Sequence, residues 1–246
     1  MSHRFFIPAS CITPPTVTLP ADAARQVRTV LRMRPGQIIM ALDNSGMEFQ
    51  VELTQVDKAA VCGQIVARQP APAEPTVQLW LYQAVLKAQK FEWILQKGTE
   101  LGVARFVPVI TERAVVRNPA ALDKKRERWR HIIREAAEQS GRGHLPELLP
   151  AMPLADALAE SAGCDRRLMP WEEASRSNTL QNALTGAPVS TIAVFIGPEG
   201  GFAPPEAAAA ESAGVQLVSL GPRILRAETA ALAVCATTMF ALRQWH

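Results

Sequence analysis

Apolar and polar residues alternate in short runs over the first part of the chain. The runs lie at residues 37–42, 48–53 and 60–66, with turn-forming sequences at 43–46 and 57–58 between them. Alternation with this spacing is typical of short strands, and it predicts a small β-barrel. We expect one helix beside these strands, over residues 21–33.

A proline-rich segment follows the last of these runs. Residues 70–75 read Pro-Ala-Pro-Ala-Glu-Pro and contain no bulky side chain. Such a composition is typical of stiff, extended linkers. The sequence therefore predicts two domains, at residues 1–70 and 76–246.

Strand and helix patterns alternate along the second predicted domain. Strands are expected at residues 77–85, 105–110, 165–169, 191–196 and 215–220. Helices are expected at residues 91–101, 123–139 and 228–243, and another is expected to contain the alanine run 207–210. This order predicts an α/β domain with an open parallel sheet.

Two of these strands stop at the same dipeptide. The apolar runs that end at Ile196 and Leu220 are each followed by Gly-Pro, at Gly197 and Gly221. We predict that the two strands are neighbours and that their C-terminal ends bring two loops to one place, where ligands of open α/β sheets bind. Glycine lets a ligand approach the backbone closely, and proline removes an N–H donor. A pocket rich in backbone carbonyl groups is expected.

Two common ligand-binding motifs do not fit these loops. A dinucleotide-binding fold needs an acid at the end of the next strand, where this sequence has Ser219-Leu220-Gly221. A phosphate-binding P-loop needs lysine and then serine or threonine after its last glycine, where this sequence has Phe202-Ala203. A nicotinamide-dependent enzyme is therefore disfavoured.

The composition indicates a protein that stays in water. The 246 residues are 48% hydrophobic with a mean hydropathy of +0.03. No apolar run approaches the roughly 18 residues that a membrane helix needs. Residues 1–8 lack the apolar core of a signal peptide. We expect a cytoplasmic protein with no membrane partner.

Cysteine and histidine residues are scattered along the chain. Cys11, Cys62, Cys164 and Cys235 have no paired spacing. Neither a zinc site nor a disulfide framework is therefore suggested, and reduced thiols are expected. The histidines, His3, His131, His144 and His246, are equally isolated. No metal site is predicted.

Positive charge is concentrated in two clusters, although the net charge is only +3. Arg25, Arg28, Arg32 and Arg34 fall within ten residues, with few acids among them. This first cluster is a candidate RNA-binding surface, and a solvated helix surface is its alternative. The second cluster, at residues 124–134, lies on an amphipathic pattern with interspersed glutamates. RNA binding and the solvent-exposed face of an amphipathic helix explain the charges of this cluster equally well.

Several motifs resemble those of the RsmE family. The C-terminal pair, residues 197–201 and 220–230, carries the resemblance most specifically. Further matches lie at residues 30–33, 96–102, 112–113 and 138–142, so the resemblance covers nearly the whole chain. Members of this family are SPOUT-class methyltransferases that methylate N3 of a uridine in bacterial small-subunit (16S) ribosomal RNA.

The resemblance implies a fold, a cofactor and partners. The parallel-sheet domain is expected to form the SPOUT trefoil knot, against the general rule that chains do not thread their own loops. The N-terminal module is expected to be a PUA-like RNA-binding barrel. S-adenosyl-L-methionine is the implied cofactor, and 16S rRNA or the small ribosomal subunit is the implied substrate.

A homodimer packed through the C-terminal helices is also implied. Small or slender residues form a stripe on that helix: Ala230, Ala231, Val234, Cys235, Thr238 and Met239. Such a stripe suits close packing between subunits, and burial inside one subunit explains it equally well.

The expected site residues fall into two sets. The cofactor is expected to contact Ile196, Gly197, Glu199, Gly200, Gly201, Leu220, Gly221, Ile224, Leu225, Thr229 and Ala230. RNA is expected to contact the first arginine cluster together with Arg113 and Arg142.

The expected chemistry requires a base and a cation. Uridine N3–H is weakly acidic, so a carboxylate base and a positive charge near the developing uridinate both help methyl transfer. Glu228 and Glu199 are candidate bases, and Arg226 is the candidate cation. The alternatives are a helix-end acid for Glu228, loop hydrogen bonds for Glu199, and an Arg226–Glu228 ion pair.

N3 lies on the Watson–Crick edge, so the target uridine must be unpaired or flipped out. A non-catalytic RNA-binding or ribosome-assembly protein that retains the fold is the alternative function. The intact segment Arg226-Ala227-Glu228-Thr229 argues against it.

Overall fold

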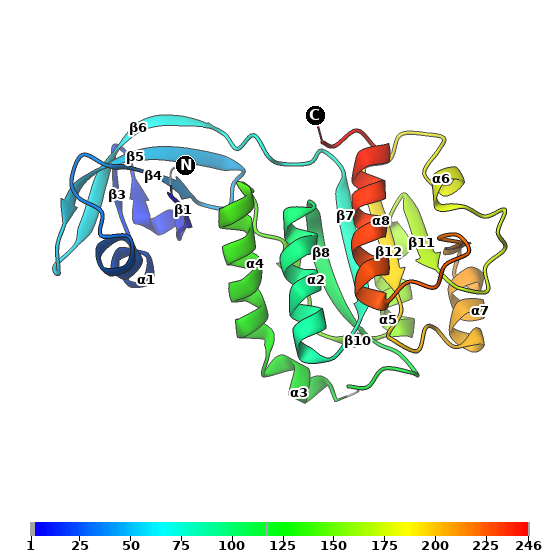
Figure 1. Cartoon of the computed structure of the whole chain (residues 1–246). Coiled ribbons are helices and arrows are strands. Elements are labelled where there is room, and N and C mark those ends of the chain that lie inside the picture. Colours follow the sequence, from blue (N-terminus) through cyan, green and yellow to red (C-terminus); the bar gives the residue numbers. More distant parts are fainter. Residues whose placement is uncertain (1–2, 117, 246) are drawn as a thin grey trace. The chain divides into compact units, whose positions relative to one another are not determined.

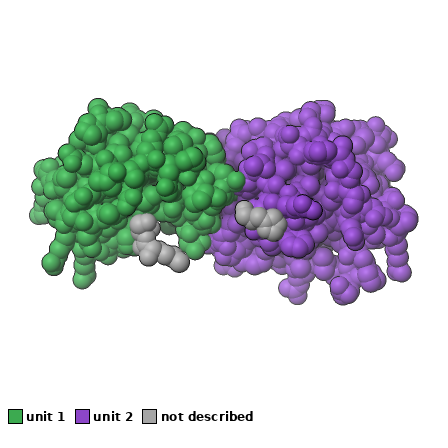
Figure 2. Space-filling model, turned by 90° about the horizontal axis from the view of Figure 1, so that it is seen from above, with its two compact units in different colours: residues 1–74, 134–145 green, residues 75–133, 146–246 purple. Residues whose placement is uncertain are grey.

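The computed structural model describes residues 3–116 and 118–245. Met1 and Ser2, which begin the segment compared with a signal peptide, and His246, one of the isolated histidines, lie outside the described residues. The chain divides into two compact units, coloured separately in Figure 2. Unit 1 comprises residues 1–74 and 134–145, and unit 2 comprises residues 75–133 and 146–246.

A six-stranded sheet forms most of unit 1. Its strands are β1 (His3–Phe6), β2 (Ile12–Thr13), β3 (Thr16–Thr18), β4 (Ile38–Leu42), β5 (Met47–Val56) and β6 (Val61–Pro70). Their order is β1-β4-β5-β6-β3-β2, with β1 parallel to β4 and the other pairs antiparallel. The three predicted strands are confirmed as β4, β5 and β6. β1, β2 and β3 were missed because they are too short to show a clear alternation.

The predicted helix over residues 21–33 is shorter and changes its winding. Helix α1 (Ala21–Arg25) continues directly into a π-helical turn, Gln26–Val30. Ala23 and Val27, which are four residues apart and therefore on one face, are buried in the core of unit 1. Arg32 then adopts a left-handed φ of 51°, which a right-handed helix cannot continue through.

Residues 134–145 belong to unit 1, although they lie within the second predicted domain along the sequence. They form the last part of helix α4 (Arg126–Ser140) and the turn after it. The backbone N–H of Phe6 donates to Glu138 Oε1 over 2.9 Å, and Ala137 packs against Phe6 and Leu42. This segment therefore supplies a hydrogen bond and an apolar cover that β1 and β4 need.

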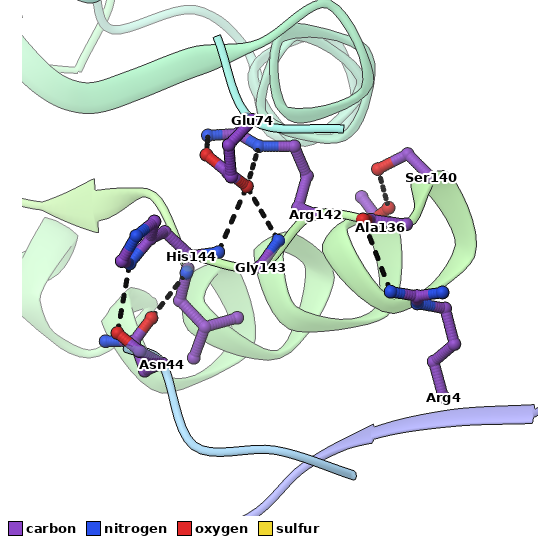
Figure 3. A network of polar contacts seen from close by, with 10 residues as sticks. Arg4, Asn44, Glu74, Ala136, Ser140, Arg142, Gly143 and His144 are labelled. Carbon is purple, nitrogen blue, oxygen red and sulfur yellow. Dashed lines mark hydrogen bonds and ion pairs between the residues drawn. The ribbon is translucent and has the colours of Figure 1, made fainter. Parts of the chain in front are cut away.

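Glu74 joins the two sequence segments of unit 1, as Figure 3 shows. Its Oε1 accepts hydrogen bonds from Arg142 Nε at 2.8 Å and from the backbone N–H groups of Gly143 and His144 at 2.7 and 3.0 Å. Ala71 N–H donates to Gly46 O over 2.8 Å. The predicted linker is thus tied to unit 1 as far as Glu74.

A parallel sheet forms the centre of unit 2 (Figure 1). Its strands are β7 (Gln78–Ala84), β8 (Val103–Ile110), β9 (Glu147–Leu148), β10 (Met152–Pro153), β11 (Arg166–Pro170), β12 (Thr191–Ile196) and β13 (Gln216–Val218). The order is β10-β8-β7-β12-β11-β13, and β9 also pairs with β8. Every pair is parallel, which confirms the predicted sheet.

One prediction about this sheet is wrong. The two strands that end at Gly-Pro, β12 and β13, are not neighbours, because β11 pairs with both of them and lies between them. β11 was predicted as a strand, but a strand pattern carries no information about its place in the sheet order.

Helices cover both faces of this sheet. They are α2 (Ala88–Glu100), α3 (Pro119–Asp123), the first part of α4, α5 (Leu154–Glu160), α6 (Leu180–Ala183), α7 (Pro204–Ser212) and α8 (Ala227–Ala241). Residues of α2, α4 and α8 share one apolar core with the sheet, and residues of α5 and α7 share another. Helices α2 and α8 lie side by side on the same face (Figure 1).

Within the described residues, no helix is long and apolar enough to span a membrane. All four cysteines are free; Cys164 and Cys235 are buried, and Cys11 and Cys62 are half-buried. Burial raises the pKa of the Cys235 thiol to about 12.

Candidate active site

A pocket of about 440 Å³ opens at the carboxyl ends of three strands of unit 2. Because the sheet is parallel, the loops after β11, β12 and β13 leave from the same edge. Their residues within 170–176, 196–202 and 219–225 line the pocket, together with Ala227 and Ala230 of α8. The two loops predicted from the sequence do meet in one place.

The loop after β12 is held from outside the pocket. Gly201 has a left-handed φ of 67°, and its N–H closes a turn on Pro198 O at 3.0 Å. Arg113 Nη1 donates to Gly200 O over 2.9 Å. Arg113, predicted to contact RNA, therefore braces this loop.

Glu206, in the first turn of α7, joins the end of the same loop to the segment after β8. Its two carboxylate oxygens accept the N–H groups of Ala203 and Glu112 at 2.9 and 2.8 Å. A carboxylate at this position is also favoured by the positive end of the helix. The loop is thereby fastened to α7 and to the segment after β8.

The loop after β13 is more exposed. Gly221 has a left-handed φ of 98°, and its N–H donates to Ser219 Oγ over 3.2 Å. A Cβ atom built at Gly221 would meet no protein atom within 4 Å, so a side chain there would project into open space. Ile224 is 84% exposed. An apolar side chain so exposed beside a pocket is available to a ligand.

The third loop, after β11, was not predicted to line the site. It places Trp171, Glu172 and Arg176 against the pocket. A Cβ atom at Gly201 would come within 2.6 Å of Glu172 Oε1, so glycine is what lets the two loops touch. The end of the predicted strand 165–169 was the signal that could have found this loop.

Most residues expected to bind the cofactor line the pocket. These are Ile196, Gly197, Glu199, Gly200, Gly201, Leu220, Gly221, Ile224, Leu225 and Ala230. Thr229 does not line it; this residue is exposed in the first turn of α8. The pocket therefore gathers nearly all of that set.

Three charged side chains meet beside the pocket. Lys90 Nζ lies 3.6 Å from Glu199 Oε1 and 3.3 Å from Glu228 Oε2. Glu228 Oε2 is buried and has no hydrogen-bond partner among the described residues. The two carboxylates predicted as candidate bases thus share one ammonium group. Lys90 was missed by the sequence analysis, because no local spacing connects it to either acid.

Arg226 is exposed at the N-terminal end of α8. Within residues 3–116 and 118–245 it forms no ion pair, so the Arg226–Glu228 pair considered above is not formed; Glu228 pairs with Lys90. The guanidinium of Arg226 is therefore available to a ligand.

The first arginine cluster lies on unit 1. Arg25, Arg32 and Arg34 are exposed, and Arg28 is half-buried. Arg28 Nη1 donates to Asp57 O over 2.9 Å. The three exposed guanidinium groups give this region a basic surface.

Arg142 has a different environment from that surface. Its side chain is 4% exposed and pairs with Glu74 inside unit 1 (Figure 3). This geometry supports a structural role for Arg142 within unit 1.

The arginines of the second cluster lie on α4 and pair with acids, whereas Lys124 and Lys125 precede this helix. Arg128 donates to both oxygens of Glu92 at 2.6 and 2.8 Å, and Arg130 donates to Glu127 at 2.6 Å. Trp129 and Ile133 are buried on the opposite face. This arrangement fits the wet face of an amphipathic helix.

The small-residue stripe on α8 lies inside the subunit. Ala231, Val234, Cys235, Thr238 and Met239 are fully buried in the core that α8 shares with the sheet. Burial within one subunit, the alternative given above, therefore accounts for the stripe. Large apolar side chains outside the stripe are exposed, at Trp93 on α2, at Phe240 on α8 and at Trp245.

No cluster of three His, Cys, Asp or Glu side chains that could hold a metal ion occurs among the described residues.

Comparison with known proteins relates this chain to RNA methyltransferases. A family model described as an RNA methyltransferase domain matches residues 72–239. The chain is 32% identical over 223 residues to the ribosomal RNA small subunit methyltransferase E of Bacillus subtilis (strain 168), which covers 89% of this chain and 87% of that protein. It is 33% identical over 231 residues to the protein of the same name from Synechocystis sp., covering 94% and 75%.

Two solved structures are also similar over nearly the whole chain. One is the ribosomal RNA small subunit methyltransferase E of Neisseria gonorrhoeae bound to S-adenosyl methionine, with a TM-score of 0.87, 34% identity and 98% of both chains covered. The other is the putative methyltransferase Lpg2936 of Legionella pneumophila in complex with SAM, with a TM-score of 0.86, 32% identity and 98% of both chains covered. The chain belongs to the RNA methyltransferase family, and its relatives within that family are the RsmE proteins.

Proposed function

We propose that this protein transfers a methyl group from S-adenosyl-L-methionine to N3 of a uridine in bacterial 16S ribosomal RNA. The observation that carries the proposal is the pocket formed by the loops after β11, β12 and β13. Its two glycine-proline loops hold the motifs that resemble the RsmE family most specifically. A relative crystallised with S-adenosyl methionine aligns with 98% of the chain.

The residues present fit this cofactor. The pocket volume of about 440 Å³ lies within the range of ligand-binding pockets. Gly221 leaves open space where a side chain would otherwise project. Glu172, Glu199, Arg176 and Arg223 line the walls, so the pocket offers acids to the cationic groups of the ligand and cations to its carboxylate. When bound, the cofactor supplies a methyl group on a positively charged sulfur.

Glu228 and Arg226 are proposed to act on the uridine. Glu228 takes the N3 proton, the N3–methyl bond forms as the methyl–sulfur bond breaks, and the neutral thioether leaves. Arg226, exposed and without an ion pair among the described residues, stabilises the negative charge that develops on the uridine. Glu199 is the alternative base.

We also propose that unit 2 is a SPOUT domain with a trefoil knot and that unit 1 is a PUA-like barrel. Support comes from the parallel sheet of unit 2, from the six-stranded sheet of unit 1, and from the resemblance of the C-terminal motifs.

We place RNA phosphates on the basic surface of unit 1, at Arg25, Arg32 and Arg34, with a further contact from Arg28. Three of these guanidinium groups are exposed, and phosphate contacts need exposed cations. Arg113 is proposed to reach RNA only secondarily, because it already braces the loop after β12. The target uridine is unpaired or flipped out when it enters the pocket.

A homodimer is proposed as the working form. Its interface is assigned to the exposed apolar side chains Trp93, Phe240 and Trp245, because the stripe on α8 is already buried. Since its proposed substrate is ribosomal RNA, we place the protein in the bacterial cytoplasm.

Small ribosomal subunits from cells that lack this protein provide the test. They are incubated with purified protein and methyl-labelled S-adenosyl-L-methionine, and the nucleosides of 16S rRNA are analysed by mass spectrometry. We expect label in 3-methyluridine. Cofactor and RNA binding without any transfer of label would instead favour the non-catalytic RNA-binding or ribosome-assembly protein.

A further inference from the structure

Lys90 occupies an unusual position for a cation. It lies in the first turn of α2 (Ala88–Glu100), where the positive end of the helix disfavours a positive side chain. The same turn contains no acid. A residue that breaks a local preference of the helix usually has a compensating partner elsewhere. Here the partners are Glu199 and Glu228, at 3.6 and 3.3 Å.

The two oxygens of Glu228 are not equivalent in this arrangement. Oε2 is buried, has no hydrogen-bond partner among the described residues, and is the oxygen that faces Lys90 Nζ. The side chain as a whole is 15% exposed. Of the two oxygens, Oε1 is therefore the one left for a substrate proton.

We infer that Lys90 is a positioning residue, which holds Oε2 of Glu228 and thereby directs Oε1 toward the uridine. This inference rests on the proposed function. The arrangement follows the general logic of a base that is oriented by a third group. Lys90 also offsets the repulsion between Glu199 and Glu228, so that the loop after β12 and the start of α8 can carry their acids close together.

A different role for Lys90 would have different consequences. If its ammonium group only joined two segments of the fold, its loss would lower stability and cofactor affinity together. If it contacted RNA phosphate, its loss would weaken RNA binding. An orienting role predicts that the methyl-transfer step slows while both affinities are kept.

The test compares single-turnover transfer by the wild type, Lys90→Met, Lys90→Arg, Glu228→Gln and the double variant Lys90→Met/Glu228→Gln. Saturating RNA and cofactor are used, and both binding constants are measured separately. Lys97→Met is the matched control. Lys97 is on the same helix, pairs with Glu100 at 2.8 Å, and is 36% exposed against 35% for Lys90. It lies about 10 Å further along the helix.

We expect Lys90→Met to slow transfer about tenfold or more, which is part of the roughly 100-fold or larger contribution of a well-placed base. Lys90→Arg should restore most of the rate, and Lys97→Met should leave it unchanged. Because Lys90 acts through Glu228, the double variant should be no slower than Glu228→Gln alone. Melting curves show whether Lys90→Met is folded. Recovery of the rate in Lys90→Arg shows that the slower transfer comes from the lost charge and not from misfolding.

Three results would overturn the role: a wild-type rate in Lys90→Met, rate losses that multiply in the double variant, or a loss confined to RNA or cofactor affinity. Absence of transfer by the wild type is a separate outcome. It would overturn the proposed function, and the role of Lys90 with it.

Discussion

The guanidinium of Arg142 donates two hydrogen bonds to the carboxylate of Glu74 inside unit 1. Nε lies 2.8 Å from Oε1, and Nη2 lies 3.2 Å from Oε2. Oε1 also accepts the backbone N–H groups of Gly143 and His144. The side chain of Arg142 is 4% exposed, so this ion pair is largely shielded from water.

Replacing Glu74 by glutamine should destabilise unit 1. The neutral amide removes the negative charge that Glu74 places beside the buried guanidinium, and breaking a buried pair from one side costs about 3 kcal/mol. Burial raises the pKa of Glu74, but the hydrogen bond and charge of Arg142, with the two backbone donors, outweigh it and hold the pKa below 4.5. The ionised acid therefore stabilises the fold at neutral pH, and this stabilisation is lost as pH falls below 4.5.

Denaturant unfolding as a function of pH checks this prediction. The difference between wild type and Glu74→Gln should be largest near neutral pH and should shrink in acid. Glu127→Gln is the control, because Glu127 pairs with Arg130 at 2.6 Å but is 84% exposed. Exposed pairs contribute less than about 1 kcal/mol. Equal effects of the two substitutions would contradict a special role for the buried pair.

Gly221→Val should abolish cofactor binding, measured by calorimetry. The side chain would project into open space beside the pocket and would strain a φ of 98°. Gly36→Val separates the two effects, because Gly36 has a φ of 87°, also faces open space, and lies in unit 1. Both variants should lose about 1 to 2 kcal/mol of stability. Full affinity in Gly221→Val would move the cofactor away from this loop.

Alanine at Arg25, Arg28, Arg32 and Arg34 should weaken RNA binding and flatten its dependence on salt. Each lost phosphate contact lowers the slope by about 0.7 to 0.9. Cofactor binding should be unchanged. Arg128→Ala with Arg130→Ala is the control, because these arginines are exposed but already paired with glutamates. An unchanged salt slope in the quadruple variant would identify the cluster as a solvated surface.

Glu228→Gln should lower the single-turnover rate of methylation by about 100-fold, because it keeps the shape of the side chain and removes the base. Arg226→Ala should lower the same rate by a similar factor through loss of charge stabilisation. RNA and cofactor affinities should change little. Glu211→Gln, at an exposed acid of α7, serves as the control. A wild-type rate in Glu228→Gln would pass the role of base to Glu199 or to water.

The site was predictable where the signal was local. Gly197 and Gly221 stop two apolar runs, and the rule for ligand sites in parallel sheets then brings their loops together. The strand between them was not predictable as a neighbour, because sheet order is set by packing of whole elements. The loop that carries Trp171 and Glu172 was missed for that reason.

Long-range pairings account for the other differences. Arg142 lies in a motif that resembles the family. Nothing near it in the sequence indicates that its guanidinium is buried and pairs with Glu74, 68 residues away. Lys90 and Glu228 are likewise joined only by the packing of α2 against α8. In each case the individual side chains were visible in the sequence, whereas their partners depend on the fold.

The two-segment composition of unit 1 has a consequence for biosynthesis. Residues 75–133 leave the ribosome between its two parts. A nascent chain that ends at residue 133 has no Ala137 to cover Phe6 and Leu42, and no Arg142 to engage Glu74. The N-terminal unit therefore matures only after residue 145 has emerged, when the first segment of the other unit, residues 75–133, has already been made. For that interval its uncovered apolar patch is available to chaperones.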